Sequence, residues 1–184
     1  MADDSDIIRL YKSGAKEEAF NQVVKIYGER LYWHIRRLVL VHEDADDLLQ
    51  NTFVKAWSAM DSFRGDSGLF TWLWRIATNE TLTFLNKRQI TGAFSLSQEP
   101  ERVGNLLKTD RNFDGDALQL TLQQAIASLP AKQRVVFTMR YYDETPYEQI
   151  SKVLGTSVGA LKASYHHAYN KVLDYVKKRI DIDY

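Results

Sequence analysis

The sequence contains long stretches without glycine or proline in which apolar residues recur at helical spacing. Nine of its 184 residues are glycine and three are proline. Residues 44–60 and 69–88 both show this spacing, and no segment alternates over the length of a strand. Between residues 19 and 40 the apolar side chains that share one helix face are Ala19, Phe20, Val23, Val24, Tyr27, Leu31, Ile35, Leu38 and Val39. The pattern predicts an all-α fold.

The helical pattern stops near residue 91 and resumes near residue 117. In between, glycines and Pro100 interrupt a polar sequence. A structureless run of about 25 residues is uncommon inside one compact domain. The sequence therefore predicts two small helical domains, residues 1–90 and 117–184, joined by a flexible linker of residues 91–116 with room for a short helical turn.

Residues 145–176 predict a helix-turn-helix. Thr145, Pro146 and Glu148 fit the N-cap, first and third positions of a helix. That helix ends at Gly155, because glycine adopts left-handed backbone angles without a Cβ clash. In a DNA-binding helix-turn-helix the second helix enters the major groove. A plain helical hairpin with a solvated, mildly basic face is the alternative.

The formal net charge of zero hides an uneven distribution. Residues 1–90 carry 12 basic and 13 acidic side chains, and residues 91–116 carry 3 and 5. Residues 117–180 carry 9 basic and 4 acidic side chains, a net charge of +5. Because a local basic excess attracts the phosphate backbone, it favours DNA as the ligand of the predicted helix-turn-helix.

An acidic cluster occupies residues 43–47, beside His42. When the apolar stripe of this helix is buried, much of the opposite face is shared by Asp47, Gln50, Asn51 and Val54. A solvated helix start, whose acids suit the helix dipole, explains the cluster without a ligand. The spacing argues against a metal site, because neighbouring residues do not converge on a helix and no HExxH or ExxH motif occurs. We expect no metal and no cofactor.

Residues 63–75 combine a loop rich in Gly, Ser and Asp with a helix that carries two tryptophans and Arg75. Aromatic rings beside cations suit unstacked bases, at ~1–3 kcal/mol per stacked base. Trp72 and Trp74 are two positions apart, so one narrow helix face cannot bury both. We expect one tryptophan in the core and the other towards an edge or a partner.

Several classes of protein are excluded by composition. The chain has no cysteine, which excludes a disulfide framework, a zinc ribbon and a thiol nucleophile. No apolar run approaches the ~18 residues needed to span a bilayer, and the acidic residues 1–6 are unlike a secretory signal. We expect a cytoplasmic protein with no direct membrane insertion.

Three stretches, in order along the chain, resemble the extracytoplasmic-function (ECF) sigma factors, small two-domain members of the sigma-70 superfamily. Residues 45–57 are similar to the polymerase-binding helix of that family, and residues 63–79 to its promoter-melting segment. Residues 129–162 are similar to its helix-turn-helix domain. The resemblance covers nearly the whole chain.

The resemblance implies a transcription factor without enzymatic activity that binds core RNA polymerase, directs it to promoters and helps to open the DNA. The loop of residues 64–69 falls where the family holds a base flipped out of the −10 element. The implied contacts with the β′ subunit are Asp47, Gln50 and Asn51. The implied contacts with the −10 element are Arg64, Gly65, Asp66, Ser67, Trp72, Arg75 and Asn79. The implied contacts with the −35 element are Ser157, Lys162, Ala163, Ser164, His166 and His167. The β subunit of polymerase and an anti-sigma factor are further implied partners.

The sequence departs from the family pattern at a few of these positions. Asn51 stands where glutamate is usual, and Ser164, His167 and Tyr169 stand where the recognition helix commonly carries arginine. Fewer fixed charges imply weaker binding of the isolated protein to duplex DNA.

Two other functional classes are weighed against this one. A stand-alone helix-turn-helix regulator accounts for the C-terminal third but leaves the aromatic loop unexplained. A helical metallohydrolase needs convergent ligands, which the spacing does not supply.

Overall fold

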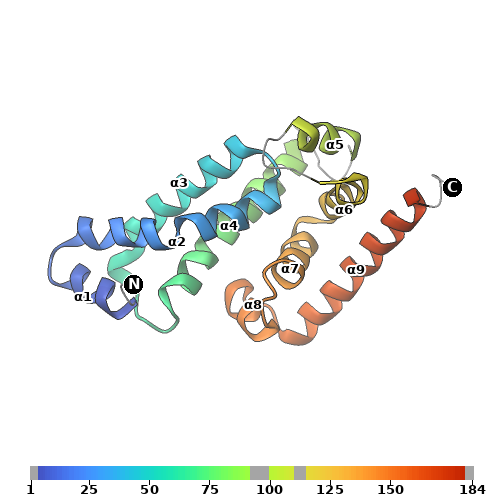
Figure 1. The fold of residues 1–184 in the computed structure, drawn as a ribbon. Helices are drawn as coiled ribbons and strands as arrows, with labels where there is room; N and C mark the ends of the chain where they lie inside the picture. The colour runs from blue at the N-terminus through green and yellow to red at the C-terminus, as the bar shows by residue number, and fades with distance from the viewer. Residues whose placement is uncertain (1–3, 92–99, 110–114, 181–184) are drawn as a thin grey trace.

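The computed structural model describes residues 4–91, 100–109 and 115–180, and within these ranges the chain forms helices and no strand (Figure 1). The predicted all-α class is confirmed. The elements are α1 (Asp4–Lys12), α2 (Lys16–Val39), α3 (His42–Ala59), the 3-10 turn η1 (Met60–Ser62), α4 (Leu69–Thr91), α5 (Pro100–Thr109), α6 (Ala117–Ala127), α7 (Ala131–Tyr141), α8 (Tyr147–Leu154) and α9 (Val158–Ile180). Among the described helices, none is both long and apolar enough to cross a membrane.

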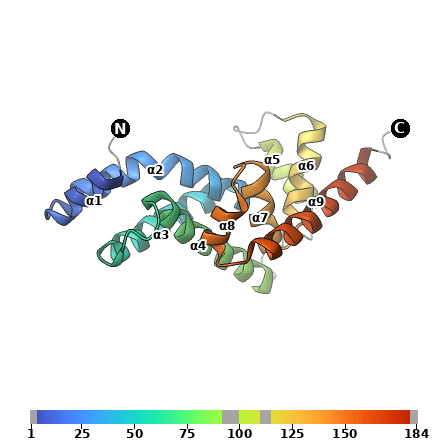
Figure 2. The ribbon, with the colours of Figure 1, turned by 90° about the horizontal axis from the view of Figure 1, so that it is seen from below.

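The helices form two halves that lie side by side. Helices α1 to α4 make the N-terminal half and α5 to α9 the C-terminal half, and α9 ends at the far side of the molecule from α1 in both views (Figures 1 and 2). The halves meet where α4 packs against α7 and α8, and where α2 packs against α7. The helix-turn-helix predicted from the sequence is thus docked on the helix predicted to melt the promoter.

Most of the apolar stripe predicted between residues 19 and 40 lies on the buried face of α2 and forms the centre of the N-terminal half, but Val24, predicted on this face, is 40% exposed. Leu31, Ile35 and Leu38 are fully buried there. Ala45 and Ala56 bring α3 close to this stripe, since both are fully buried and carry only a methyl group. Close packing of this kind excludes water from the apolar surface, which is the main favourable contribution to folding.

One apolar core runs through both halves. The buried residues Leu31 of α2, Leu73 of α4, Val135 of α7 and Ile150 of α8 belong to one contiguous cluster. A second, smaller cluster lies within the C-terminal half, between α6, α7 and α9, and includes Phe137. The predicted domain pair is therefore joined by shared core packing as well as by the chain.

Part of the predicted linker is a helix. Helix α5 has ten residues, more than the short helical turn expected from the sequence. It begins with Pro100, a favoured first residue of helices. Val103 and Leu107, four positions apart, are both buried, and the helix packs against α6. The rest of the predicted linker between α4 and α6, apart from residues 115 and 116, lies outside the described residues.

The turn of the helix-turn-helix forms at the predicted glycine. Gly155 has φ 62° and donates its N–H to the carbonyl of Ser151 at 2.8 Å. The predicted assignment of Thr145 to the N-cap of α8 is wrong. Pro146 occupies the N-cap position, and the Thr145 hydroxyl donates to the carbonyl of Asp143 at 3.3 Å. The chain turns at Glu144, which has φ 47°, and this turn places Thr145 in the interior.

Arg134 is a buried cation that joins the two halves. Its guanidinium donates to the carbonyl of Leu38 at 3.1 Å, to the carbonyl of Leu129 at 3.2 Å and to the carbonyl of Ala127. Two of these acceptors lie in the last turns of α2 and α6, where carbonyls lack a partner inside the helix. Burial lowers the pKa of Arg134 to about 10, so the side chain remains charged at neutral pH.

We expect Arg134→Ala to lower the free energy of unfolding by about 3 kcal/mol, because it leaves buried carbonyls without donors. Chemical denaturation monitored by circular dichroism measures this change. Lys132→Ala, which alters an exposed cation on the same helix, is the matched control and should change stability by less than about 0.5 kcal/mol. Equal stability of the two variants would contradict the role assigned to Arg134.

Candidate protein and nucleic-acid interfaces

Helix α3 exposes the three polar residues that the sequence groups on one face. Asp47, Gln50 and Asn51 are all exposed, and Val54 beside them is 64% exposed. The buried residues of the same helix are Ala45, Leu48, Thr52 and Ala56. The predicted division of this helix into a buried and an open face is confirmed, so these side chains are available to a partner.

Two of the acids at the start of α3 are engaged in pairs. Asp44 accepts two hydrogen bonds from Arg88 of α4, at 2.6 and 3.2 Å. Burial is the larger influence on Asp44 and raises its pKa, while Arg88 opposes the rise. Asp46 lies 3.3 Å from the ring of His42, whose other nitrogen is 2.7 Å from the Tyr32 hydroxyl. In the part of the chain that the structure describes, no three His, Asp or Glu side chains gather as metal ligands would.

The two tryptophans at the start of α4 separate as expected. Trp74 is 4% exposed and packs edge-on against His34, with ring centroids 5.2 Å apart. Trp72 is half-buried and packs against Phe63 of the preceding loop, with ring centroids 5.1 Å apart. Trp72 therefore forms part of the loop's surface, and Trp74 belongs to the core.

The loop before α4 is irregular and open. Residues 63–68 form neither helix nor strand, and Gly65 has φ 78°, a conformation that favours glycine. Arg64 and Asp66 are exposed, while Ser67 is half-buried. The loop residues thus lie together at one end of α4.

The two other predicted −10 residues lie further along α4, and one of them contacts the C-terminal half. Arg75 and Asn79 are both exposed, four positions apart. The Arg75 guanidinium donates to the backbone carbonyl of Lys152 in α8. Helix α8 therefore occupies part of the surface that sequence reasoning assigns to the −10 element.

Helix α9 presents most of the predicted −35 residues on its outer surface. Lys162, Ala163, His166 and His167 are exposed. Ser164 is half-buried and borders a cavity of about 140 Å³, which is also lined by Leu82 of α4. Predicted residue Ser157 has a structural role as well, because its hydroxyl accepts the N–H of Ala160 at 3.3 Å and caps α9.

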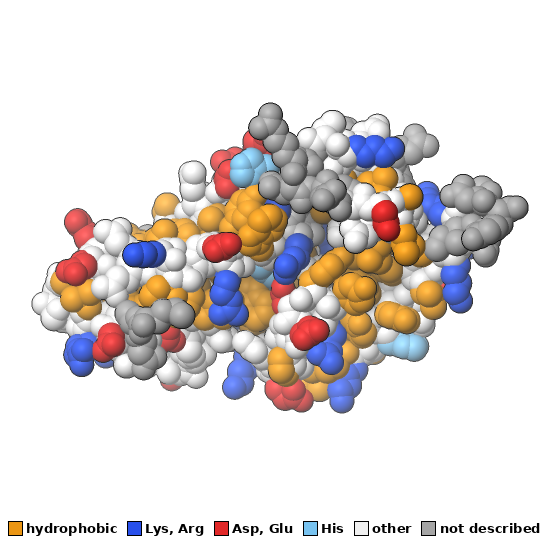
Figure 3. Space-filling view, in the orientation of Figure 1, with side chains coloured by type: hydrophobic (Ala, Val, Ile, Leu, Met, Phe, Trp, Pro, Cys, Tyr) orange, Lys and Arg blue, Asp and Glu red, His pale blue; other side chains and the backbone are white. Residues whose placement is uncertain are grey.

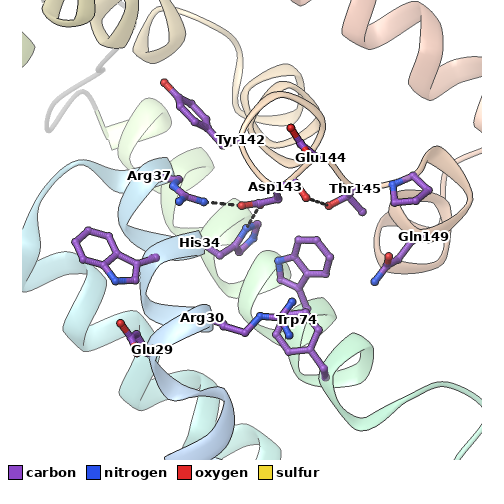
Figure 4. A pocket seen from close by; sticks show the side chains of 13 residues that line it. Glu29, Arg30, His34, Arg37, Trp74, Tyr142, Asp143, Glu144, Thr145 and Gln149 are labelled. Atoms are coloured by element: carbon purple, nitrogen blue, oxygen red, sulfur yellow. Dashed lines mark hydrogen bonds and ion pairs between the residues drawn. The ribbon is translucent and has the colours of Figure 1, made fainter. Parts of the chain in front are cut away.

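A polar contact that the sequence analysis missed lies between the halves. Asp143, in the turn between α7 and α8, accepts a hydrogen bond from Arg37 at 2.5 Å and lies 3.4 Å from Nδ1 of His34. Figure 4 shows both α2 side chains reaching this carboxylate. The other ring nitrogen of His34 is 3.0 Å from the hydroxyl of Thr78 in α4. Asp143, Arg37 and His34 border a cavity of about 440 Å³.

The environment of His34 favours its neutral form. The side chain is 3% exposed, and burial is the largest influence on its pKa, which falls below the ordinary value of 6.5. Asp143 opposes this shift, and Arg37 adds to it. The signal in the sequence was a histidine inside the apolar stripe of α2, between Leu31 and Ile35.

We expect His34 to make the protein less stable in acid. The imidazole of His34 takes up a proton less readily in the folded protein than in the unfolded chain. The stabilising contribution of the neutral imidazole is therefore complete above pH 6.5 and is lost as the pH falls from 6.5 towards the lower pKa of the folded state. Thermal unfolding of the wild-type protein and of His34→Gln at pH 8.0 and pH 5.5 measures the effect. The wild-type melting temperature should fall further than that of the variant, and an equal fall would contradict this assignment.

Apolar and tyrosine side chains gather over α7 and α9 on the surface shown in Figure 3. Tyr141 is 46% exposed, Tyr169 45% and Leu173 37%. Tyr141 stacks on the buried Phe137, with ring centroids 5.2 Å apart. On the N-terminal half in this view, acidic and basic side chains are interspersed.

Comparison with known proteins identifies the class to which this fold belongs. Residues 23–90 match the sequence family described as Sigma-70 region 2, and residues 119–172 match Sigma-70, region 4. The chain is 31% identical to the ECF RNA polymerase sigma-E factor of Escherichia coli K12, and the match covers 98% of this chain and 97% of the relative. It is 30% identical over 167 residues to the ECF RNA polymerase sigma factor SigW of Bacillus subtilis, covering 86% and 89%.

Two solved structures share this fold. CnrH in complex with the cytosolic domain of CnrY has a TM-score of 0.64 at 25% identity, over 98% of this chain and 99% of CnrH. RpoE of Bartonella quintana in complex with the anti-sigma factor NepR has the same TM-score and identity, over 86% of this chain and 96% of RpoE. The chain belongs to the ECF group of the sigma-70 family, whose members are transcription initiation factors.

Proposed function

We propose that this sigma factor acts in the cytoplasm, where it binds core RNA polymerase and directs it to promoters with defined −10 and −35 elements. The observation that carries the proposal is the presence of both sigma regions in one chain, with each predicted contact surface at least partly accessible to solvent. A stand-alone helix-turn-helix regulator accounts only for region 4. The match to region 2 therefore disfavours that alternative.

The exposed face of α3 is the proposed contact with the β′ subunit. Asp47, Gln50 and Asn51 offer one charge and two amides beside the apolar surface of Val54. A patch with an apolar centre and polar groups around it resembles the usual composition of a protein interface. Asn51 can both donate and accept a hydrogen bond, so the absence of a glutamate here removes a charge but keeps an acceptor.

The loop before α4 and the exposed side of α4 are the proposed contact with the melted −10 element. Arg64, Gly65, Asp66 and Ser67 would surround one unstacked base, with Trp72 beside them. Arg75 and Asn79 would follow the single strand along α4. Stacking on aromatic rings and neutralisation of phosphate by arginine together stabilise single-stranded DNA without needing a groove.

The start of α9 is the proposed contact with the −35 element. Lys162, His166 and His167 are exposed there, with Ala163 between them; Ser157, just before the helix, is exposed as well, and Ser164 is half-buried. One lysine and two histidines supply few phosphate contacts, so free protein should bind duplex weakly. Core polymerase would then supply most of the affinity.

An anti-sigma factor is a further proposed partner. RpoE of Bartonella quintana was solved with the anti-sigma factor NepR, and CnrH with the cytosolic domain of CnrY. This chain shares their fold over most of its length.

Transcription by reconstituted polymerase tests the proposed function as a whole. Bacterial core polymerase with the purified chain should initiate from a discrete set of genomic promoter fragments, and core polymerase alone should not. Failure to bind core polymerase, or initiation without promoter preference, would overturn the proposal.

The double variant Gln50→Ala/Asn51→Ala tests the polymerase contact. It removes two amides from the exposed face of α3, and we expect core affinity to fall about tenfold, since each lost hydrogen bond contributes about 0.5–1.5 kcal/mol. Fluorescence anisotropy of the labelled chain titrated with core polymerase measures this affinity. Ser58→Ala is the control, because the hydroxyl of this exposed residue of α3 donates to the carbonyl of Val54 within the same helix. Unchanged affinity of the double variant would exclude this face.

The variant Asn79→Ala tests the contact with single-stranded DNA. We expect open-complex formation to fall about tenfold, while binding to core polymerase changes less than twofold. A template with a preformed −10 bubble separates melting from later steps, and transcription from it should recover in part. Thr83→Ala, one turn further along α4, removes a hydroxyl that bonds the carbonyl of Asn79 and should behave as wild type. Parallel losses of core binding and opening would contradict the role given to Asn79.

A further inference from the structure

Helix α1 was not anticipated from the sequence, and it holds both ends of the loop before α4. Ile7 is fully buried and Tyr11 is 7% exposed, and both lie on one face of α1, which packs against α2. The helix is therefore fixed on the N-terminal half. Residues at both of its ends then reach across to the segment of residues 61–69.

The first attachment lies at the start of α1. One oxygen of Asp4 accepts the backbone N–H of Leu69 at 2.7 Å, and the other accepts the hydroxyl of Tyr27 in α2. Leu69 is the first residue of α4, and the residue before it is Gly68, which has no side chain that could cap the helix. The first N–H groups of a helix lack partners inside the helix. Asp4 therefore acts as a cap supplied by a different helix.

The second attachment lies at the end of α1. The Tyr11 hydroxyl donates to a carboxylate oxygen of Asp61 at 3.0 Å, and Lys16 donates to the same oxygen at 2.7 Å. Asp61 lies in η1, two residues before the loop begins. The hydrogen bonds from Lys16 and then Tyr11 lower the pKa of Asp61, so the carboxylate remains ionised at neutral pH.

At the second attachment, the first residue of the loop borders a cavity against the end of α1. The cavity has a volume of about 220 Å³, and its lining includes Tyr11, Lys12 and Lys16 on one side and Asp61 and Phe63 on the other. Phe63 in turn packs on Trp72. The shape of the loop surface thus depends on where α1 lies.

We propose that α1 sets the shape of the loop that would hold the flipped −10 base, with Asp4 and Tyr11 as positioning residues. This inference rests on the proposed function of the loop. A loop of six residues whose ends are fixed loses conformational freedom before DNA binds, and less entropy is then lost on binding. A fixed loop also discriminates between bases, because a wrong base cannot be accommodated by a change in loop shape.

The variant Asp4→Ala tests the positioning role through base discrimination. The probe is a single-stranded DNA oligonucleotide that spans the −10 element of a promoter used by the wild-type protein, together with versions substituted at each −10 position. The full chain is assembled with core polymerase, and the affinity ratio between matched and substituted oligonucleotides is measured. For the flipped base we expect a ratio of about tenfold in the wild-type complex and below about threefold in Asp4→Ala.

The ratio separates positioning from simple loss of structure. A variant that only unfolds more readily lowers the active fraction for every oligonucleotide equally, and so leaves the ratio unchanged. Asp4→Asn keeps an oxygen that can accept the Leu69 N–H and should restore most of the discrimination. Asp6→Ala, on the same helix, removes an exposed side chain paired with Arg9 and is the matched control.

Tyr11→Phe tests the other attachment without removing buried volume. It deletes the hydroxyl that bonds Asp61, keeps the ring in place, and should lower the same ratio. Wild-type ratios in both Asp4→Ala and Tyr11→Phe would overturn the inference while the proposed function stands. A wild-type complex that does not discriminate at any −10 position would instead remove the proposed role of the loop, and this inference with it.

Discussion

Helix α4 is buried on more than one side, and the arrangement of the molecule depends on this burial. Leu73 and Ala77 are fully buried, as are the small polar side chains Thr78 and Thr81. The helix packs on α2 and α3 within its own half and on α7 and α8 of the other half. A helix whose exposed polar face is narrow must be covered on its other sides. The N-terminal half alone would expose part of α4, so the C-terminal half completes its core.

Polar groups buried at this junction are held by specific partners, and they fix how the halves meet. Thr78 and Thr81 each donate to a carbonyl one turn earlier in α4, both at 2.8 Å. Arg134 donates hydrogen bonds to carbonyls of both halves, and Asp143 accepts a hydrogen bond from Arg37. An apolar contact tolerates sliding, whereas a buried hydrogen bond is lost when its partners shift. The apolar core therefore gives the junction its stability, and the hydrogen bonds of Arg134 and Asp143 give it one register.

The long helices and the division of α3 into two faces could be predicted from the sequence, because apolar periodicity reports directly on burial. The separation of Trp72 and Trp74 followed from their spacing alone. Helix α1 was missed because it is nine residues long, and its most informative residue, Asp4, acts on a segment 65 positions away. The contact of His34 with Asp143 spans 109 positions. Neither pairing leaves a local pattern, since both arise only when the chain has folded.

The hydrogen bond from Arg75 to the carbonyl of Lys152 has a thermodynamic consequence for DNA binding. A ligand that uses the Arg75 guanidinium must compete with α8 of the same chain. Its apparent dissociation constant then equals the intrinsic value divided by the fraction of molecules in which the two helices are apart. Polymerase binding that separates the halves would raise this fraction. The same contact would thus make promoter DNA a poor ligand of the free protein and a good ligand of the assembled holoenzyme.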